Sequence, residues 1–389
     1  MMRCRRHHIT PLFIAILGSS AALWGCKEPY ISPYQSPVTG YLVVEGYISG
    51  NGATQFTLSR TIPLPGKSPL PKITGAAVEV EGTDGSVYPL TEMGNGIYSD
   101  SNALPLTTAA HYKLRIKTPN GEEYLSDTVP FKPTPPIDSV NFIQNNDNSV
   151  NIYVNSHDPT NNTRYYLWNW DQTFEYHSAE ESLYYWDPTL DSVLLRPDTA
   201  QVYRCWLSGS SSSILVGNSM KLAQDEIYRQ KINMIPPNDV QLSVLYTTLV
   251  RQYALTQAGY NFLSLMQQNT ESLGSIFDAQ PSALKSNIHC LTNPSEEVIG
   301  YVSAGTVQQY RLWISREQIQ SSFDYQCDGK DGFIPLGDTT DYKNDFGSVY
   351  SPISFTVYHG LQGYGINYTD CLVCTWHGGT NHAPSYWPN

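Results

Sequence analysis

Alternation of apolar and charged residues, broken by turn dipeptides, constrains the fold of this chain more than any other feature. In the stretch "HYKLRIKT", Tyr112, Leu114 and Ile116 alternate with lysine and arginine. A period of two gives a β-strand one buried row and one wet row of side chains. Val78 and Val80 alternate with glutamates in the same way. Tight hairpins are predicted where such runs are separated by three dipeptides: Asp84-Gly85, Asn95-Gly96 and Asn120-Gly121.

The pattern divides the chain into two parts. Residues 41–131 carry short strands without helical periodicity and predict an immunoglobulin-like β-sandwich. Residues 132–139, "KPTPPIDS", form a Pro-rich linker, because prolines cannot donate to a strand ladder. Residues 140–389 predict a larger, aromatic-rich β domain with a cysteine-containing C-terminal tail. The predicted fold class is therefore mainly β.

One helix is expected within the second domain. Its apolar residues recur at helical spacing, with Thr256 as the N-cap and Gly274 at the end. The residues of this apolar face are Ala258, Phe262, Leu265 and Met266.

The N-terminus reads as an export signal. Residues 1–25 contain three arginines followed by an apolar run that is too short to cross a bilayer comfortably. The four residues "LWGC" that end at Cys26 resemble a bacterial lipobox, although Trp24 replaces the usual small residue. The resemblance implies lipidation of Cys26, and residues 26–40 would be a tether between the anchor and the folded protein.

Charge and motifs exclude several classes of function. The net charge is −12, and removal of the three signal arginines lowers it to −15. A chain this acidic lacks the basic surface that nucleic acid requires. The sequence contains no Gly-rich phosphate loop, Gly-x-Ser-x-Gly elbow or His-Glu-x-x-His motif. We therefore expect a protein without catalytic activity and without a cofactor.

The cysteines of an exported chain are expected to form disulfides. Five cysteines follow Cys26, so one thiol remains unpaired, and Cys290 in the apolar run "NIHCLT" is the candidate. Two bridges are then expected among Cys205, Cys327, Cys371 and Cys374, pinning the tail to the second domain. The sequence leaves the pairing open, including a bridge between Cys371 and Cys374.

The tail "DCLVCTWHGGTNHAPSYWPN" also permits a metal site. Cys371, Cys374, His377 and His382 are residue types that bind zinc, although compact zinc sites usually draw their second ligand pair from a distant knuckle. In the disulfide alternative, Gly378-Gly379 supplies a turn, and Tyr386 and Trp387 dock as apolar anchors.

Aromatic clusters are the candidate binding residues. Adjacent aromatic residues occupy both faces of two predicted strands, and if exposed they would form a stacking platform for a ligand or a protein partner. Burial of both faces in a central strand is the alternative. The candidates are Tyr165, Tyr166, Trp168, Trp170, Tyr184, Tyr185 and Trp186. The adjacent pairs Glu180-Glu181 and Glu296-Glu297 are expected to be solvated.

Several ordered motifs together resemble the domain of unknown function 4249 family of Bacteroidota lipoproteins. The motifs are "LVVEGYISGNGATQFTLSRT", "PPIDSV", "FDAQPSALKSNI", "NPSEEVIGYVSAGTVQQYRLWI" and the cysteine-containing tail. The resemblance implies a lipid-anchored outer-membrane protein at the cell surface that assists a TonB-dependent receptor in nutrient uptake, binding an unidentified small ligand or glycan. A structural or adhesive surface protein is one alternative, and a surface glycan hydrolase or a zinc-binding protein is another.

Overall fold

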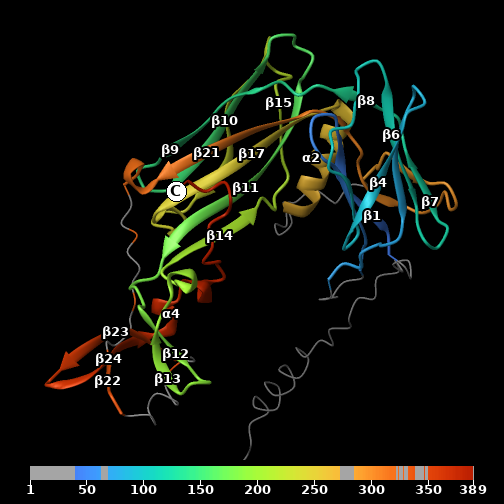
Figure 1. Ribbon diagram of the computed structural model, residues 1–389. Helices are drawn as coiled ribbons and strands as arrows, with labels where there is room; N and C mark the ends of the chain where they lie inside the picture. The colour runs from blue at the N-terminus through green and yellow to red at the C-terminus, as the bar shows by residue number, and fades with distance from the viewer. Residues whose placement is uncertain are drawn as a thin grey trace, which may run out of the picture.

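The computed structural model describes residues 40–62, 69–271, 284–320, 332–337 and 349–388, together with Phe323, Cys327 and Phe346. Cys26 and Gly274 lie outside these residues. The described chain is mainly β, as expected, and forms three bodies (Figure 1). No helix in the described residues is long and apolar enough to span a membrane.

The first body is a sheet whose strand pairing closes on itself. β6 pairs with β3 and also with β8, so the sheet is barrel-like. Its first eight strands are β1 (Leu42–Ser49), β2 (Thr54–Arg60), β3 (Ala77–Gly82), β4 (Val87–Gly94), β5 (Ile97–Asp100), β6 (His111–Lys117), β7 (Glu123–Ser126) and β8 (Val129–Lys132). Its last three are β18 (Ile288–Cys290), β19 (Val298–Gly300) and β20 (Ala304–Gly305).

Alternation predicted the buried rows of this body correctly. Tyr112, Leu114 and Ile116 of β6 are fully buried, and their charged neighbours are more exposed. All three predicted hairpin turns form. Gly85, Gly96 and Gly121 have φ values of 85°, 72° and 84°, which a glycine adopts without steric cost.

The boundary between the first two bodies differs from the sequence prediction. Three strands from the part of the chain assigned to the second domain belong to the first body. β18 pairs with β7, β19 pairs with β1, and β20 pairs with both β1 and β8. Buried Ile288 and Val302 complete the core of the first body. These strands have only two or three residues, too few to show a period, and their partners are distant in sequence.

The second body contains a three-stranded sheet packed against a larger sheet around one aromatic core. The smaller sheet contains β9 (Ile137–Gln144), β10 (Val150–Asp158) and β16 (Asp225–Ile235). The larger contains β11 (Tyr165–His177), β14 (Arg204–Ser210), β15 (Leu215–Asn218), β17 (Leu245–Leu255) and β21 (Val307–Ser315). Short 3-10 turns are η1 (Asp198–Ala200), η2 (Val240–Leu242) and η3 (Arg316–Gln318).

The predicted helix is α2 (Gln257–Glu271). Thr256 caps it as expected: its Oγ1 accepts a hydrogen bond from the Gly259 N–H at 3.1 Å. Phe262 is buried and packs on Tyr301 with ring centroids 5.4 Å apart. Ala258 is exposed, contrary to the predicted apolar face, and Gly259 is the buried residue of that turn.

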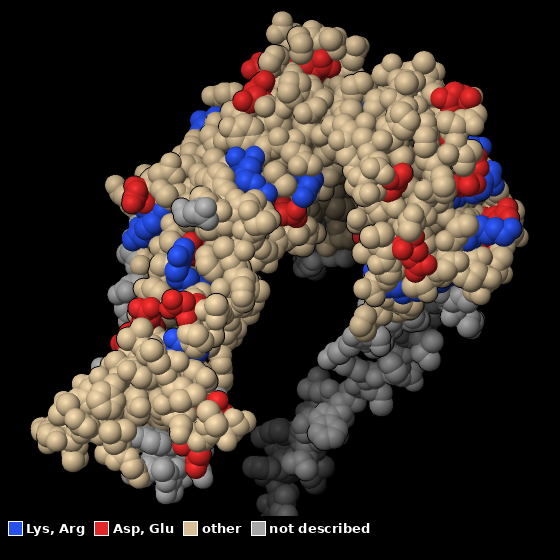
Figure 2. All heavy atoms as spheres, viewed as in Figure 1, with Lys and Arg blue, Asp and Glu red and all other residues tan. Residues whose placement is uncertain are grey.

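The third body, which we call the arm, projects away from the second (Figure 1). It contains the hairpin of β12 (Tyr184–Asp187) and β13 (Ser192–Leu195), and a sheet of β22 (Gly332–Pro335), β23 (Tyr350–Tyr358) and β24 (Leu361–Tyr368). The tail follows through α4 (Thr369–Leu372) and η4 (Cys374–His377). In Figures 1 and 2 the arm and the first body extend from the second body toward the same side, like two legs of an arch.

Candidate functional site

A cavity of about 490 Å³ lies where the first body, the second body and α2 meet. β1 contributes Tyr47, β17 contributes Tyr253, and α2 contributes Phe262, Leu263 and Met266. The cavity has the size and mainly apolar lining of small-molecule sites, which are frequent at domain interfaces.

The two tyrosines join the bodies at this cavity. The rings of Tyr47 and Tyr253 meet edge to face, with centroids 5.0 Å apart. Burial raises the pKa of both phenols above the ordinary value of 10. Asn51, in the turn after β1, also joins the two bodies: it donates from Nδ2 to the Val307 carbonyl, and the Val307 N–H donates to Asn51 Oδ1, each at 2.8 Å.

Among the described residues that line this cavity, Glu45 alone is charged at neutral pH. Its side chain is exposed, and no lysine, arginine, histidine or second carboxylate of the described chain lines the walls. Acid-base hydrolysis of a glycoside requires two carboxyl groups about 5 to 10 Å apart. The cavity walls therefore suit binding of a largely apolar molecule better than hydrolysis.

A second, more polar cavity of about 390 Å³ lies between the ends of β10 and β16. Its two buried carboxylates, those of Asp158 and Asp225, accept hydrogen bonds from the chain itself. Asp158 accepts hydrogen bonds from the backbone N–H groups of Asn162 and Thr163, at 3.0 and 2.8 Å. Asp225 accepts one from the Tyr166 hydroxyl at 2.5 Å. In the described part of the chain, no three His, Cys, Asp or Glu residues are grouped so that they could hold a metal ion.

The aromatic candidates of β11 lie mostly in the core. β11 pairs with β17 on one side and with β14 and β15 on the other, so it is a central strand. Tyr166 and Trp168 are fully buried and stack on each other, and Trp170 is 8% exposed. This burial excludes the three as an exposed stacking platform, because they share the face of β11 that packs into the core of the second body. Tyr165 packs on Tyr260 of α2.

The other aromatic candidates lie in the arm, far from β11 in the fold. Tyr184 packs on Tyr364, and Trp186 packs on Phe346. The guanidinium of Arg196 lies over the ring of Tyr185, with its Cζ 5.8 Å from the ring centroid. The structure therefore separates two clusters that the sequence suggested as one type of platform.

The cysteines form two disulfides, as expected. Cys205 of β14 is bonded to Cys374, and Cys327 is bonded to Cys371, with Cα atoms 5.8 and 5.7 Å apart. Cys290 is the free, buried thiol. Cys371 and Cys374 do not bridge each other. Their sulfurs are not available as thiolate ligands, so they do not form the alternative zinc site with His377 and His382.

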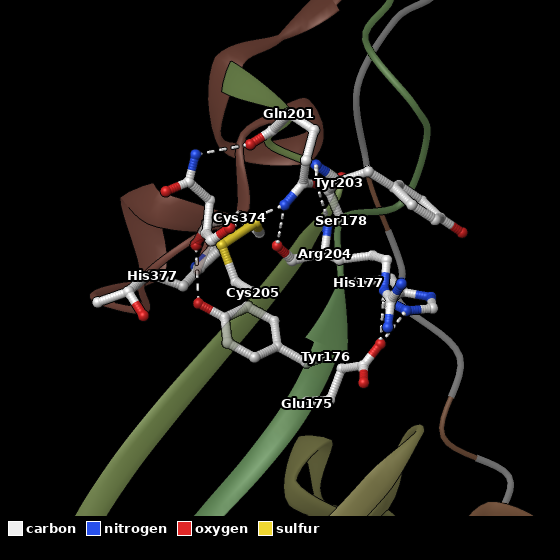
Figure 3. The surroundings of a disulfide bond; sticks show 12 residues. Glu175, Tyr176, His177, Ser178, Gln201, Tyr203, Arg204, Cys205, Cys374 and His377 are labelled. Atoms are coloured by element: carbon white, nitrogen blue, oxygen red, sulfur yellow. Dashed lines mark hydrogen bonds and ion pairs between the residues drawn. A yellow bond between two sulfur atoms is a disulfide. The ribbon is translucent and has the colours of Figure 1, made fainter. Parts of the chain in front are cut away.

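The tail closes over β11 and β14 beside the first of these disulfides (Figure 3). The Tyr176 hydroxyl donates to the Cys374 carbonyl at 2.7 Å. Gly378 has a φ of 84°, and a side chain on Gly379 would collide with the Tyr176 ring, so this turn requires its two glycines. The predicted glycine turn is confirmed.

Of the two predicted apolar anchors, Trp387 is buried as predicted, whereas Tyr386 is 44% exposed and contacts the Thr173 hydroxyl through its own hydroxyl, at 2.8 Å. Trp387 is buried between Trp206 and Trp313, and its Nε1 donates to Glu175 at 3.1 Å. Glu175 also accepts hydrogen bonds from Arg204 and pairs with His177. Burial raises the pKa of this carboxyl, but the hydrogen bonds from His177, Arg204 and Trp387 outweigh it and hold the pKa at about 2.

Sequence reasoning missed a surface at the end of the arm. β23 and β24 join through a two-residue turn in which His359 and Gly360 have φ values of 50° and 84°. Phe355, Val357, Tyr358 and Leu361 beside this turn are 43%, 59%, 57% and 56% exposed. The signal was present in the sequence, because residues 346–369 contain no Asp, Glu, Lys or Arg.

The model of one protein family, described as domain of unknown function (DUF4249), matches residues 27–311. The chain belongs to this family. The match covers the first body and most of the second, and residues 312–389 lie outside it. No curated protein matches the chain.

Two solved structures are also similar to this DUF4249 chain over about half of its length. A cytokine receptor complex shares 12% identity over 54% of this chain and 90% of that chain, with a TM-score of 0.17. The FN1–FN3 domains of chicken CNTN1 share 12% identity over 56% of this chain and 63% of that chain, with a TM-score of 0.18. At these TM-scores the likeness carries no argument about fold or function.

Proposed function

We propose that this protein is a non-catalytic outer-membrane lipoprotein that binds a small, largely apolar ligand as an accessory of a TonB-dependent uptake system. The cavity between the first body, the second body and α2, which we call the junction cavity, carries the proposal. It is walled by Tyr47, Tyr253, Phe262 and Met266, and Glu45 is the one charged residue among its described lining. In this proposal Cys26 is the lipid anchor, and the first body is an immunoglobulin-like spacer that forms one wall of the site.

The cavity can be tested with the neutral dye Nile red, which fluoresces in apolar surroundings. Leu263→Trp places a larger ring into the cavity from α2 and should reduce dye binding by about tenfold. Asn261→Trp adds the same ring at an exposed position of the same helix and is the matched control. Equal dye binding by both variants and the wild type would refute the cavity as the site.

The partner is tested by purifying the full-length lipidated protein from its own membranes in mild detergent. Recovery of a TonB-dependent receptor at a near one-to-one ratio is the expected result. Recovery with only peptidoglycan or surface polymers would instead favour the adhesive alternative and reject the uptake role.

A further inference from the structure

The exposed end of the arm has the properties of a surface that meets an apolar phase. Val357, Tyr358 and Leu361 lie next to the β23–β24 turn and are each more than half exposed. Large apolar side chains exposed together on one protrusion indicate a protein or membrane interaction site. We refer to these three residues and Phe355 as the arm tip.

The absence of charged residues around the arm tip indicates which kind of surface it can contact. The run 346–369 has no charged residue, whereas charged residues make up 15% of the whole chain. Figure 2 shows the resulting uncharged face on the arm, beside a second body that carries clusters of both signs. An uncharged tip on a chain of net charge −12 has no electrostatic attraction to anionic lipids, so its chemistry fits the interface of a zwitterionic bilayer.

The position of the arm agrees with this. The arm and the first body project to the same side of the molecule, and β1 begins in the first body (Figure 1). The 16 residue steps from Cys26 to Leu42, where β1 begins, can span at most about 58 Å. This reach allows a membrane that holds Cys26 to lie on the side toward which the arm points.

From these observations we infer that the arm tip is a second membrane contact, inserting shallowly into the bilayer in which Cys26 is anchored. The side chains of Val357 and Leu361 enter the headgroup boundary, and the phenol of Tyr358 stays at the polar interface. Deeper insertion would cost free energy, because β23 is an edge strand of its sheet in the described chain. The N–H and C=O groups on its unpaired edge need water as a hydrogen-bond partner, and the hydrocarbon core contains none. The orientation rests on the anchor in the proposed function.

The geometry of the arm base supports such a contact. The Cys327–Cys371 disulfide joins the two ends of the chain segment that contains β22, β23 and β24. The Cys205–Cys374 disulfide then fixes the following residues to β14. The first bridge closes the arm at its base, and the second ties the residues after the arm to the second body, which favours contact of the tip and the anchor with one membrane.

The test is flotation of residues 27–389, which lack both the export signal and the lipidated cysteine, with phosphatidylcholine vesicles. The wild-type tip should bind, and 0.5 M salt should not weaken binding, because the contact is apolar. The triple variant Val357→Thr, Tyr358→Thr and Leu361→Thr retains β propensity and should lower the partition coefficient by at least about tenfold. Val87→Thr, Met93→Thr and Tyr228→Thr together are the matched control, since they remove equally exposed apolar residues from other faces.

A gain-of-binding variant tests the inference even if the triple variant loses its fold. Val357→Trp should strengthen the partition and shift tryptophan emission to the blue on vesicles. Absence of wild-type flotation, binding abolished by salt, or equal loss in the control would overturn the inference. Tip-dependent recovery of a receptor without vesicle binding would also overturn it and assign the tip to a protein partner. Because the test omits the lipid, its failure leaves the uptake proposal standing.

Discussion

Glu175 shows how single residues of β11 hold the C-terminal tail. Its carboxylate is 5% exposed and joins Arg204 of β14 to Trp387 of the tail. Its pKa of about 2 lies below the ordinary value of 4.5, so the charged form stabilises the fold above pH 4.5, and this contribution is lost as the pH falls toward 2. Glu175→Gln should lower the free energy of unfolding by about 2–3 kcal/mol at pH 7 and by much less near pH 2.

Urea denaturation at pH 7, 4 and 2 measures this difference. Glu181→Gln changes an exposed carboxylate close by and should leave stability unchanged within about 0.5 kcal/mol. A Glu175→Gln penalty that stays constant with pH would show that packing, and not charge, sets the cost of this substitution.

At the scale of elements, the two disulfides hold the arm and the tail in place. Removing Cys327–Cys371 by a double serine substitution opens the base of the segment that carries β22–β24. We expect proteolytic cleavage within residues 349–368 to become at least about tenfold faster, while the first body stays protected, because local opening governs cleavage.

Thiol counting on the denatured, lipidated protein provides the check on connectivity. One thiol, that of Cys290, should react before reduction, and five should react after it. If Cys371 and Cys374 both react in the unreduced sample, the disulfides described above are absent and the protease prediction fails with them.

At the scale of the whole molecule, the chain returns to its first body after building most of the second. β20 lies between β1 and β8, and Ile288, Val298 and Val302 are buried in the first core. Burial of three such side chains contributes about 5 kcal/mol or more, which is comparable to the stability of a small domain. A fragment of residues 41–131 should therefore show no cooperative thermal transition.

Joining residues 284–306 to the fragment 41–132 through a flexible linker should restore a cooperative melt followed by circular dichroism. A sharp transition in the shorter fragment alone would show that the returning strands are dispensable and that the boundary near residue 132 is sufficient.

Glu296 lies in the segment that folds back onto the first body, and its side chain makes contacts there. The sequence predicted a solvated carboxylate, because a second glutamate follows it. That prediction was wrong: Glu296 is 14% exposed, accepts a hydrogen bond from Arg60 at 3.0 Å and another from the Tyr124 hydroxyl at 2.7 Å. Only the folding of residues 284–306 onto the first body brings these partners together, so no local pattern could reveal them.

The sequence by itself determined the local features of this protein. Period-two alternation identified the strands of the first body, glycine dipeptides located its hairpins, and Thr256 marked the start of α2, since each of these depends on neighbouring residues alone. The odd number of cysteines predicted one spare thiol, and the apolar run around Cys290 identified it.

Tertiary structure decided what depends on distant residues. The pairing Cys205–Cys374 and Cys327–Cys371, the burial of Tyr166 and Trp168, and the junction cavity all arise from segments far apart in the chain. The same adjacent aromatics could occupy an exposed or a central strand, because strand order is set by long-range pairing and not by the strand's own composition.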